Sequence, residues 1–293
     1  MRSLITSLFL FAIGGTFAQE VLTAEEAVRI ALEQNYGIRL ARLDARTSEV
    51  LNNVGNAGML PTLDANGFYT VDNSSTKQTF FSGEVREADN ANSRVLDGVL
   101  AMNWTVFDGL TMFAAKDRLE ALEIIGRTEL RRQMETTVYD VLTGYYLAVQ
   151  LQKAVVVQQE GLRTSNERLQ IATAAERIGS ASGLAVVQAR LDLSEDSSAI
   201  LDLLQQKAMA LTRLNMLIGR APATPTQVAN EIPASEVLDL TALQNEARAG
   251  NTVVQQAKQQ QMLADISVKE LRGALFPRVD LFGNYGYTKS TSA

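Results

Sequence analysis

The sequence predicts an exported α+β membrane protein in which long α-helical coiled-coil hairpins continue from a β-barrel that several chains complete. Three observations carry this prediction. An apolar leader opens the chain, two alternating runs between 62 and 107 are joined by a polar loop, and the stretch 109–218 has a nearly unbroken helical pattern. Together they indicate an exported chain with too few strands to close a barrel by itself.

Composition excludes several classes of function. The 293 residues include 27 basic and 33 acidic side chains, and the net charge of −6 argues against nucleic acid as a partner. The chain has no cysteine, which excludes disulfides, thiolate catalysis and zinc–thiolate sites. It also has no histidine, the usual general base and the commonest metal ligand. Since no constellation of acid, base and nucleophile appears, we expect neither an enzyme nor a cofactor.

Residues 1–18 are expected to be a cleaved signal peptide. Arg2 precedes the apolar run "LITSLFLFAIGG", and the small residues of "TFA" at 16–18 offer a cleavage site. The mature chain would then begin at Gln19. The alternative is an uncleaved anchor helix, for which the apolar run is short.

Residues 23–59 are expected to form helices that lead into the first strand. Thr23 and Glu26 have the spacing of a capping box, and helical periodicity follows from Ala27. The segment "NYG" at 35–37 interrupts this periodicity, and Pro61 then helps to end the second helix.

After Pro61 the period changes to two, which predicts a β-hairpin over 62–107 with a polar loop at 73–92. The side chains expected to face lipid are Leu96, Leu100, Met102 and Trp104. The side chains expected to line the barrel lumen are Asp64, Asn66, Asp97 and Asn103. The half-buried sheet of a water-soluble protein would alternate in the same way and is the alternative. Export and a continuous apolar face of membrane-spanning length favour the barrel.

The stretch 109–218 is expected to be a long helical hairpin. Two helical arms meet at one cluster of small, turn-prone residues, and the first arm would be roughly 100 Å long. Arms of this length imply coiled-coil-like packing. The residues of the turn are Gly179, Ser180, Ala181, Ser182, Gly183 and Leu184. Residues 219–237, which begin with "GRAPATPTQ", are expected to be a linker.

After this linker the opening pattern restarts. Asn35 recurs as Asn251 and Pro61 as Pro277, both at the same offset in the numbering (251 − 35 = 277 − 61 = 216). The first repeat would therefore cover 19–230, and 238–293 would be the incomplete start of a second repeat. Because 293 − 216 = 77, the last residue lies opposite Lys77, inside the first hairpin. We expect the sequence to be a C-terminally truncated fragment of a protein of about 446 residues (230 + 216). Chance similarity between amphipathic helices would not explain the shared change of period after each proline.

The chain resembles the TolC family of outer-membrane efflux channels along essentially its whole mature length. The resemblance rests on the two helix-to-strand junctions, Leu60-Pro61 and Phe276-Pro277, and on four further motifs in their order along the chain. These motifs are "NWTVFDGL" (103–110), "VYDVLTGYYLAV" (138–149), "GSASGLAVVQAR" (179–190) and "LNMLIGR" (214–220). Each motif is weak alone, but their order around an internal repeat is specific.

The resemblance implies a homotrimer whose chains each give four strands to a twelve-stranded outer-membrane β-barrel that continues into a periplasmic α-helical tunnel. It implies that the turn at 179–184 docks a periplasmic adaptor and, through it, an inner-membrane pump of the RND or ABC type. The function implied is passive conduction in tripartite efflux or type I secretion.

Two features depart from the family pattern. Ala185 stands where the family often has an aspartate that helps to hold the tunnel shut, and the second hairpin, which mainly lines the closed entrance, lies beyond this sequence. The alternative function is a non-conducting exported coiled-coil protein with a structural or adhesive role.

Overall fold

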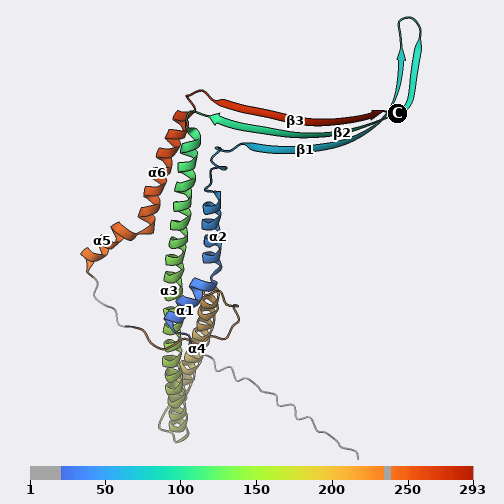
Figure 1. The fold of residues 1–293 in the computed structure, drawn as a ribbon. Helices are drawn as coiled ribbons and strands as arrows, with labels where there is room; N and C mark the ends of the chain where they lie inside the picture. Colours follow the sequence, from blue (N-terminus) through green and yellow to red (C-terminus); the bar gives the residue numbers. More distant parts are fainter. Residues whose placement is uncertain (1–20, 234–238, 293) are drawn as a thin grey trace, which may run out of the picture. The chain divides into compact units, whose positions relative to one another are not determined.

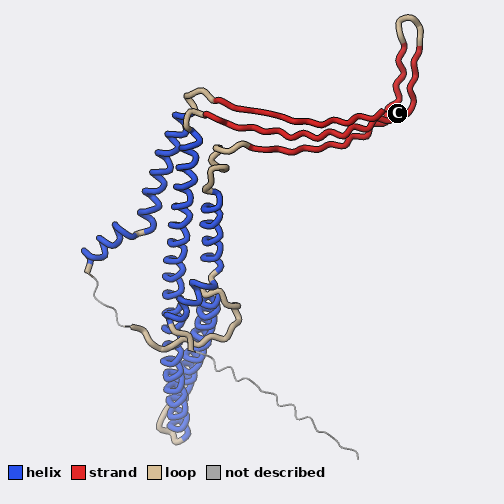
Figure 2. Tube along the Cα trace, viewed as in Figure 1, coloured by secondary structure: helices blue, strands red, loops and turns tan. Residues whose placement is uncertain are grey.

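The computed structural model describes residues 21–233 and 239–292 (Figures 1 and 2). The expected signal peptide, the last residues of the expected linker and the first residue of the expected second repeat lie outside the described residues. The elements in chain order are α1 (Ala24–Gln34), α2 (Tyr36–Leu51), β1 (Thr62–Thr79), β2 (Val85–Phe107), α3 (Thr111–Arg177), α4 (Gly183–Leu217), α5 (Leu240–Gly250), α6 (Thr252–Gly273) and β3 (Val279–Ser292).

The chain forms two compact units. One unit consists of the chain up to Ala41 together with Leu130–Gln244, and the other consists of Arg42–Glu129 together with the chain from Asn245. The first unit contains α1, α4 and most of α3, and the second contains the sheet and α6.

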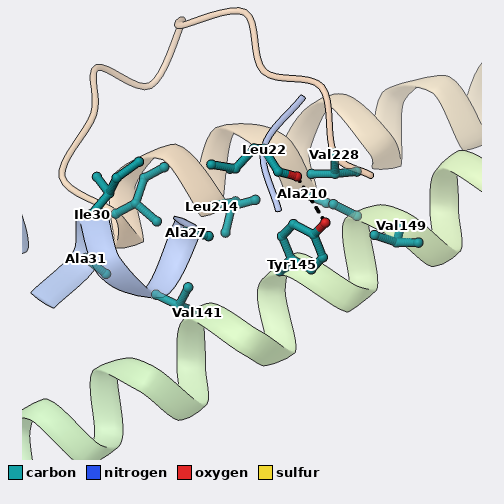
Figure 3. Close-up of a cluster of buried hydrophobic side chains, with 12 residues drawn as sticks. Leu22, Ala27, Ile30, Ala31, Val141, Tyr145, Val149, Ala210, Leu214 and Val228 are labelled. Atoms are coloured by element: carbon teal, nitrogen blue, oxygen red, sulfur yellow. Dashed lines mark hydrogen bonds between the residues drawn. The ribbon is translucent and has the colours of Figure 1, made fainter. Parts of the chain in front are cut away.

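The core of the first unit gathers apolar side chains from four segments, namely the N-terminal segment with α1, α3, the end of α4 and the linker at Val228 (Figure 3). Ala27, Ile30 and Ala31 form the buried face of α1, which begins where the Thr23 hydroxyl accepts a hydrogen bond from the Glu26 amide (3.2 Å). The buried partners from α3 and α4 are Val141, Tyr145, Ala148, Val149, Ala210 and Leu214. The motif at 138–149 therefore supplies one side of this core.

Tyr145 anchors the N-terminal segment to α3. Its hydroxyl donates to the Leu22 carbonyl (3.0 Å), and burial raises the pKa of the phenol. The returning linker pairs with the same segment, since the Leu22 amide donates to the Gln227 carbonyl (2.8 Å) and the Ala229 amide donates to the Leu22 carbonyl (3.1 Å).

Two asparagines organise the end of the helical hairpin. Buried Asn215 donates to the Thr224 carbonyl (2.8 Å) and accepts from the Thr226 hydroxyl (2.7 Å), which folds the linker back on α4. Asn35 donates to the Leu217 carbonyl (2.7 Å) and accepts from the Ile38 amide (3.1 Å). Asn35 thus joins α1, α2 and the end of α4 at the interruption that the sequence shows at 35–37.

Two expectations about element bounds are wrong. The helices end at Leu51 rather than at 59, because the Asn53 side chain donates to the Val50 carbonyl and accepts from the Asn56 amide, which replaces helical hydrogen bonds with turns. The expected loop at 73–92 is mostly strand, and only residues 80–84 form the turn. Polar strands exposed on both faces show no alternation, so the pattern could not indicate them.

The element bounds repeat along the chain. The start and the end of α5 follow those of α1 at the offset found in the sequence (240 − 24 = 250 − 34 = 216), and the start of α6 follows that of α2 at the same offset (252 − 36 = 216). Asn251 accepts hydrogen bonds from the Val253 and Val254 amides, as its counterpart Asn35 accepts from the Ile38 amide. The two segments therefore fold with the same helix–break–helix geometry.

The second unit joins strands to helices at a close backbone contact. Pro61 precedes β1 directly and Pro277 lies two residues before β3. After β2, Gly109 has a φ of +72°, and a Cβ there would lie 2.1 Å from the Gly273 carbonyl oxygen of α6. A Cβ at Gly273 would lie 2.3 Å from the Thr111 hydroxyl. Only glycine fits at either position.

Replacing Tyr145 by phenylalanine should lower the free energy of unfolding by about 1 kcal/mol, because the hydrogen bond to Leu22 is lost while the Leu22 carbonyl keeps the Ala229 amide. Chemical denaturation followed by circular dichroism measures this change. Tyr139→Phe on an exposed position of the same helix is the control and should be neutral. Equal stability of the two variants would contradict the anchoring role of Tyr145.

Replacing Gly273 by alanine should destabilise the protein by about 1–3 kcal/mol, since the added methyl group collides with Thr111 and with the Gly109 backbone. Gly250→Ala is the matched control, because no atom lies within 4 Å of its added Cβ, and alanine should be neutral or stabilising there. The same denaturation assay compares the two variants. A neutral Gly273→Ala would show that the backbone at Gly273 and at Gly109 can move apart without loss of stability.

Candidate conduction surface and helical tip

The three strands form one antiparallel sheet in the order β1-β2-β3 (Figure 2). Thr62 lies opposite Asn103 in the first pair, and Trp104 lies opposite Leu281 in the second. Directly opposite residues share a face, so the register assigns each side chain to one of two faces. A register shift between Ser74 and Thr76 marks a bulge, and beyond the end of β3 the hairpin of β1 and β2 bends away from the three-stranded sheet (Figure 1).

One face, which we call the apolar face, runs from the junction to the bulge. It carries the four residues expected to face lipid, Leu96, Leu100, Met102 and Trp104, and aliphatic and aromatic neighbours from the outer strands. These neighbours are Leu63, Tyr69, Val71, Leu281, Tyr285 and Tyr287. At the helix end of this face, the Trp104 indole donates to the Met59 carbonyl (3.1 Å).

The opposite face, which we call the polar face, carries Asp64, Asn66, Asp97 and Asn103 together. The register places Asp64 opposite Ala101 and Asp97 opposite Phe68, so the four residues expected in the lumen share one surface. Three residues that were not among the expected lumen residues, Asp72, Asp280 and Asn284, also lie on this face. For Asp280 and Asn284 of β3, the alternation over 279–288 is the sequence pattern that could have indicated this face.

Charges separate completely between the two faces. Between the junction and the bulge, all four carboxylates of the strands (Asp64, Asp72, Asp97 and Asp280) lie on the polar face, and both cations (Arg94 and Lys289) lie on the apolar face. A sheet wetted on both sides does not require charge to be separated in this way.

One of the four carboxylates is neutralised. The Arg278 guanidinium donates to both oxygens of Asp280 (2.9 Å each) and to the Thr105 hydroxyl, which in turn donates to Asp280 (2.8 Å). Within the described residues Asp64 and Asp97 have no such ion pair. The polar face is therefore net anionic.

The expected docking turn joins α3 to α4. Gly179 has a φ of +73°, and the amides of Ser180 and Ala181 both donate to the Ala175 carbonyl and close the end of α3. Ser182 occupies the N-cap of α4, but its hydroxyl makes no capping hydrogen bond. Leu184 is 75% exposed, so an apolar side chain and a hydroxyl that caps no helix lie together at the turn.

Polar contacts also hold the two arms of the hairpin together. Asp196 of α4 accepts hydrogen bonds from the Gln158 amide (3.1 Å) and from the buried Ser165 hydroxyl, both on α3. These contacts fix the register of the arms between the core and the turn. Among the residues that the structure describes, no helix has the length and apolar character to cross a membrane.

Comparison with known structures shows the fold. The outer membrane channel CmeC of Campylobacter jejuni superposes with a TM-score of 0.71 at 12% identity, over 92% of this chain and 61% of that one. The open state of the MtrE channel of Neisseria gonorrhoeae gives 0.65 at 16% identity, over 92% and 62%. The outer membrane protein VceC of Vibrio cholerae gives 0.65 at 13% identity, over 92% and 67%.

The chain thus spans about three fifths of the length of the structures it matches. No curated protein sequence gives a significant match. The model of the outer membrane efflux protein family matches residues 27–220, which is most of the chain and includes both helical arms and the first hairpin. This match agrees with the resemblance to TolC-type channels, and the family and the fold are those of channel proteins. The chain therefore belongs to the outer membrane efflux protein family and is located in the outer membrane.

Proposed function

We propose that the protein is the outer-membrane channel subunit of a tripartite efflux or type I secretion system and conducts substrates passively across the outer membrane. The observation that carries this proposal is the separation of charge on the sheet, with an apolar face on one side and net anionic polar groups on the other. A membrane barrel needs this arrangement, because lipid contacts one side of each strand and water the other.

The two edges of the sheet support assembly from several chains. Within the described residues, β1 and β3 each have β2 as a hydrogen-bonded neighbour on one side only. Open edges are not tolerated in lipid, because each unpaired backbone group costs free energy. Closure by identical chains gives a homotrimer of the kind that the family resemblance implies. A soluble coiled-coil protein with a structural role would have no use for such a sheet.

The helices support a role in reaching a partner. α3 is 67 residues long, which corresponds to about 100 Å of continuous helix. It ends in a turn that exposes Ser182 and Leu184, the surface proposed to dock the periplasmic adaptor and its inner-membrane pump. As a passive conduit the protein carries out no chemical step, and the pump supplies the energy.

Arginine substitutions on the two faces test the channel proposal. Leu100→Arg places a charge near the middle of the apolar face and should cost roughly 2–4 kcal/mol in the membrane, whereas Ala101→Arg on the polar face should be tolerated. Wild type and variants are extracted from outer membranes with detergent, and the amount of trimer and the single-channel conductance in planar bilayers are measured.

For the complete natural protein, the expected result is a conducting wild-type trimer, loss of trimer for Leu100→Arg, and a conducting trimer with altered ion selectivity for Ala101→Arg. Recovery of the wild type as a soluble rod without detergent would refute the channel. Equal loss of trimer for both variants would refute the assignment of the faces.

Substitution of Ser182 by glutamate tests the docking turn. A negative charge at the N-cap is compatible with α4, because the helix dipole favours it there, so the trimer should assemble normally. Export of a pump substrate should nevertheless be lost, since the charge disrupts an apolar contact surface. Ser198→Glu at an exposed position within α4 is the control and should export normally. Normal export by Ser182→Glu would exclude this turn from docking.

A further inference from the structure

We propose that Arg94 and Lys289 form a binding site on the apolar face for a phosphate-bearing lipid headgroup of the outer leaflet. The two side chains lie on neighbouring strands of one face, with Arg94 opposite Thr291 and Lys289 opposite Leu96. They are therefore diagonal neighbours, and residues in such positions are about 7–8 Å apart, within reach of long side chains. The inference rests on the proposed function, because it requires the apolar face to contact lipid.

The position along the strands points to the headgroup region of the membrane. Trp104 lies at the helix end of β2, and Arg94 lies ten positions before it on the same strand (104 − 94 = 10). Ten strand positions correspond to roughly 33 Å, and a strand tilt of about 40° reduces this to roughly 25 Å along the membrane normal. That distance is the height of the apolar band of a membrane barrel.

Tyrosines border the two cations on the side of the apolar band. Tyr69 lies opposite Leu96, the residue that also lies opposite Lys289, and Tyr287 precedes Lys289 by two residues on the same face. Both tyrosines are exposed. Tyrosine is typical of the membrane interface, where its ring contacts acyl chains and its hydroxyl contacts headgroups. Arg94 and Lys289 therefore lie at the boundary where phosphate groups are found.

The charges of Arg94 and Lys289 have no counterpart on the protein. No carboxylate lies on the apolar face between the junction and the bulge, and neither cation has an ion pair among the described residues. The four carboxylates that the strands carry between the junction and the bulge all lie on the opposite face. On a face that contacts lipid, a negative charge from outside the sheet would neutralise this pair, and an arginine beside a lysine suits a phosphate, which can accept a bidentate hydrogen bond.

The orientation of the strands identifies the leaflet. The helices join the sheet at Thr62 and Phe107, and in the proposed channel these ends face the periplasm. Arg94 and Lys289 lie at the other end of the apolar face, where Arg94 is opposite Val71, shortly before the register shift between Ser74 and Thr76. The headgroup that they meet is consequently one of the outer leaflet.

Lipid binding to the delipidated full-chain protein in detergent tests this proposal. Native mass spectrometry measures the affinity for phosphatidic acid, which carries a phosphomonoester, and for phosphatidylcholine with the same acyl chains. We expect wild type to prefer phosphatidic acid. Arg94→Gln and Lys289→Gln should each reduce this preference roughly fivefold, and the double variant roughly 30-fold, as expected for the loss of one or two cations near a lipid surface.

Matched variants separate the site from general effects of charge. Arg86→Gln removes a cation that lies beyond the bulge and is paired with Glu84 (3.1 Å), and it should leave the preference unchanged. Arg94→Lys keeps the charge and should keep most of the preference, which shows that a loss in Arg94→Gln is not a folding defect. Inorganic phosphate should not displace the lipid.

Three results would overturn the proposal. They are equal affinity of the wild type for the two lipids, equal effects of Arg86→Gln and Arg94→Gln, and displacement of phosphatidic acid by inorganic phosphate at matched concentration. The binding assay is independent of conduction. If the wild type binds phosphatidic acid in detergent but does not conduct in planar bilayers, the channel proposal is refuted and the lipid site stands. If the wild type conducts but does not prefer phosphatidic acid, only the lipid site is refuted.

Discussion

A strand that contacts lipid must have every backbone amide and carbonyl paired, and this constraint governs how the sheet of this protein can be used. β2 is satisfied, because β1 and β3 pair with it on both sides. β1 and β3 have one paired edge each within the described residues. The apolar face therefore becomes compatible with a bilayer only when further strands close the sheet, which ties membrane insertion to assembly.

The separation of charge follows from the same constraint. In the proposed channel a side chain on the apolar face has lipid as its solvent, so an acidic group would be costly there and a long basic side chain would be tolerated only where it reaches the headgroups. Arg94 and Lys289 obey this rule, since both lie at the end of the apolar face. Asp64 and Asp97 lie on the polar face, where water would solvate them in the proposed channel.

The duplicated segments show which contacts the fold needs twice and which have diverged. Asn35 and Asn251 keep the same role at a helix break, with their side chains accepting from backbone amides. Asp64 and Asp280 occupy equivalent positions at the start of a strand (280 − 64 = 216), but Arg278 neutralises only Asp280. At the junction, Gly273 meets Gly109 at a distance that admits no side chain. The backbone geometry is repeated, while the electrostatics differ.

The sequence alone determined the helix–strand–helix order, the long hairpin with its turn at 179–184, the internal repeat and the family, because each of these is a periodic or local signal. Alternation also grouped Asp64, Asn66, Asp97 and Asn103, which the register places on one face, while their place in a barrel lumen stays a prediction. Only the tertiary structure decided three further points. The strands continue through the polar segment 73–92, because cross-strand pairing rather than alternation stabilises them there. Arg94 and Lys289 lie in diagonal positions on neighbouring strands although they are far apart in the sequence, because register between strands is a long-range property that no local pattern encodes. The anchoring contacts of Tyr145 and Asn215 likewise depend on segments brought together by folding, and a tyrosine or asparagine in a helical pattern does not reveal its distant partner.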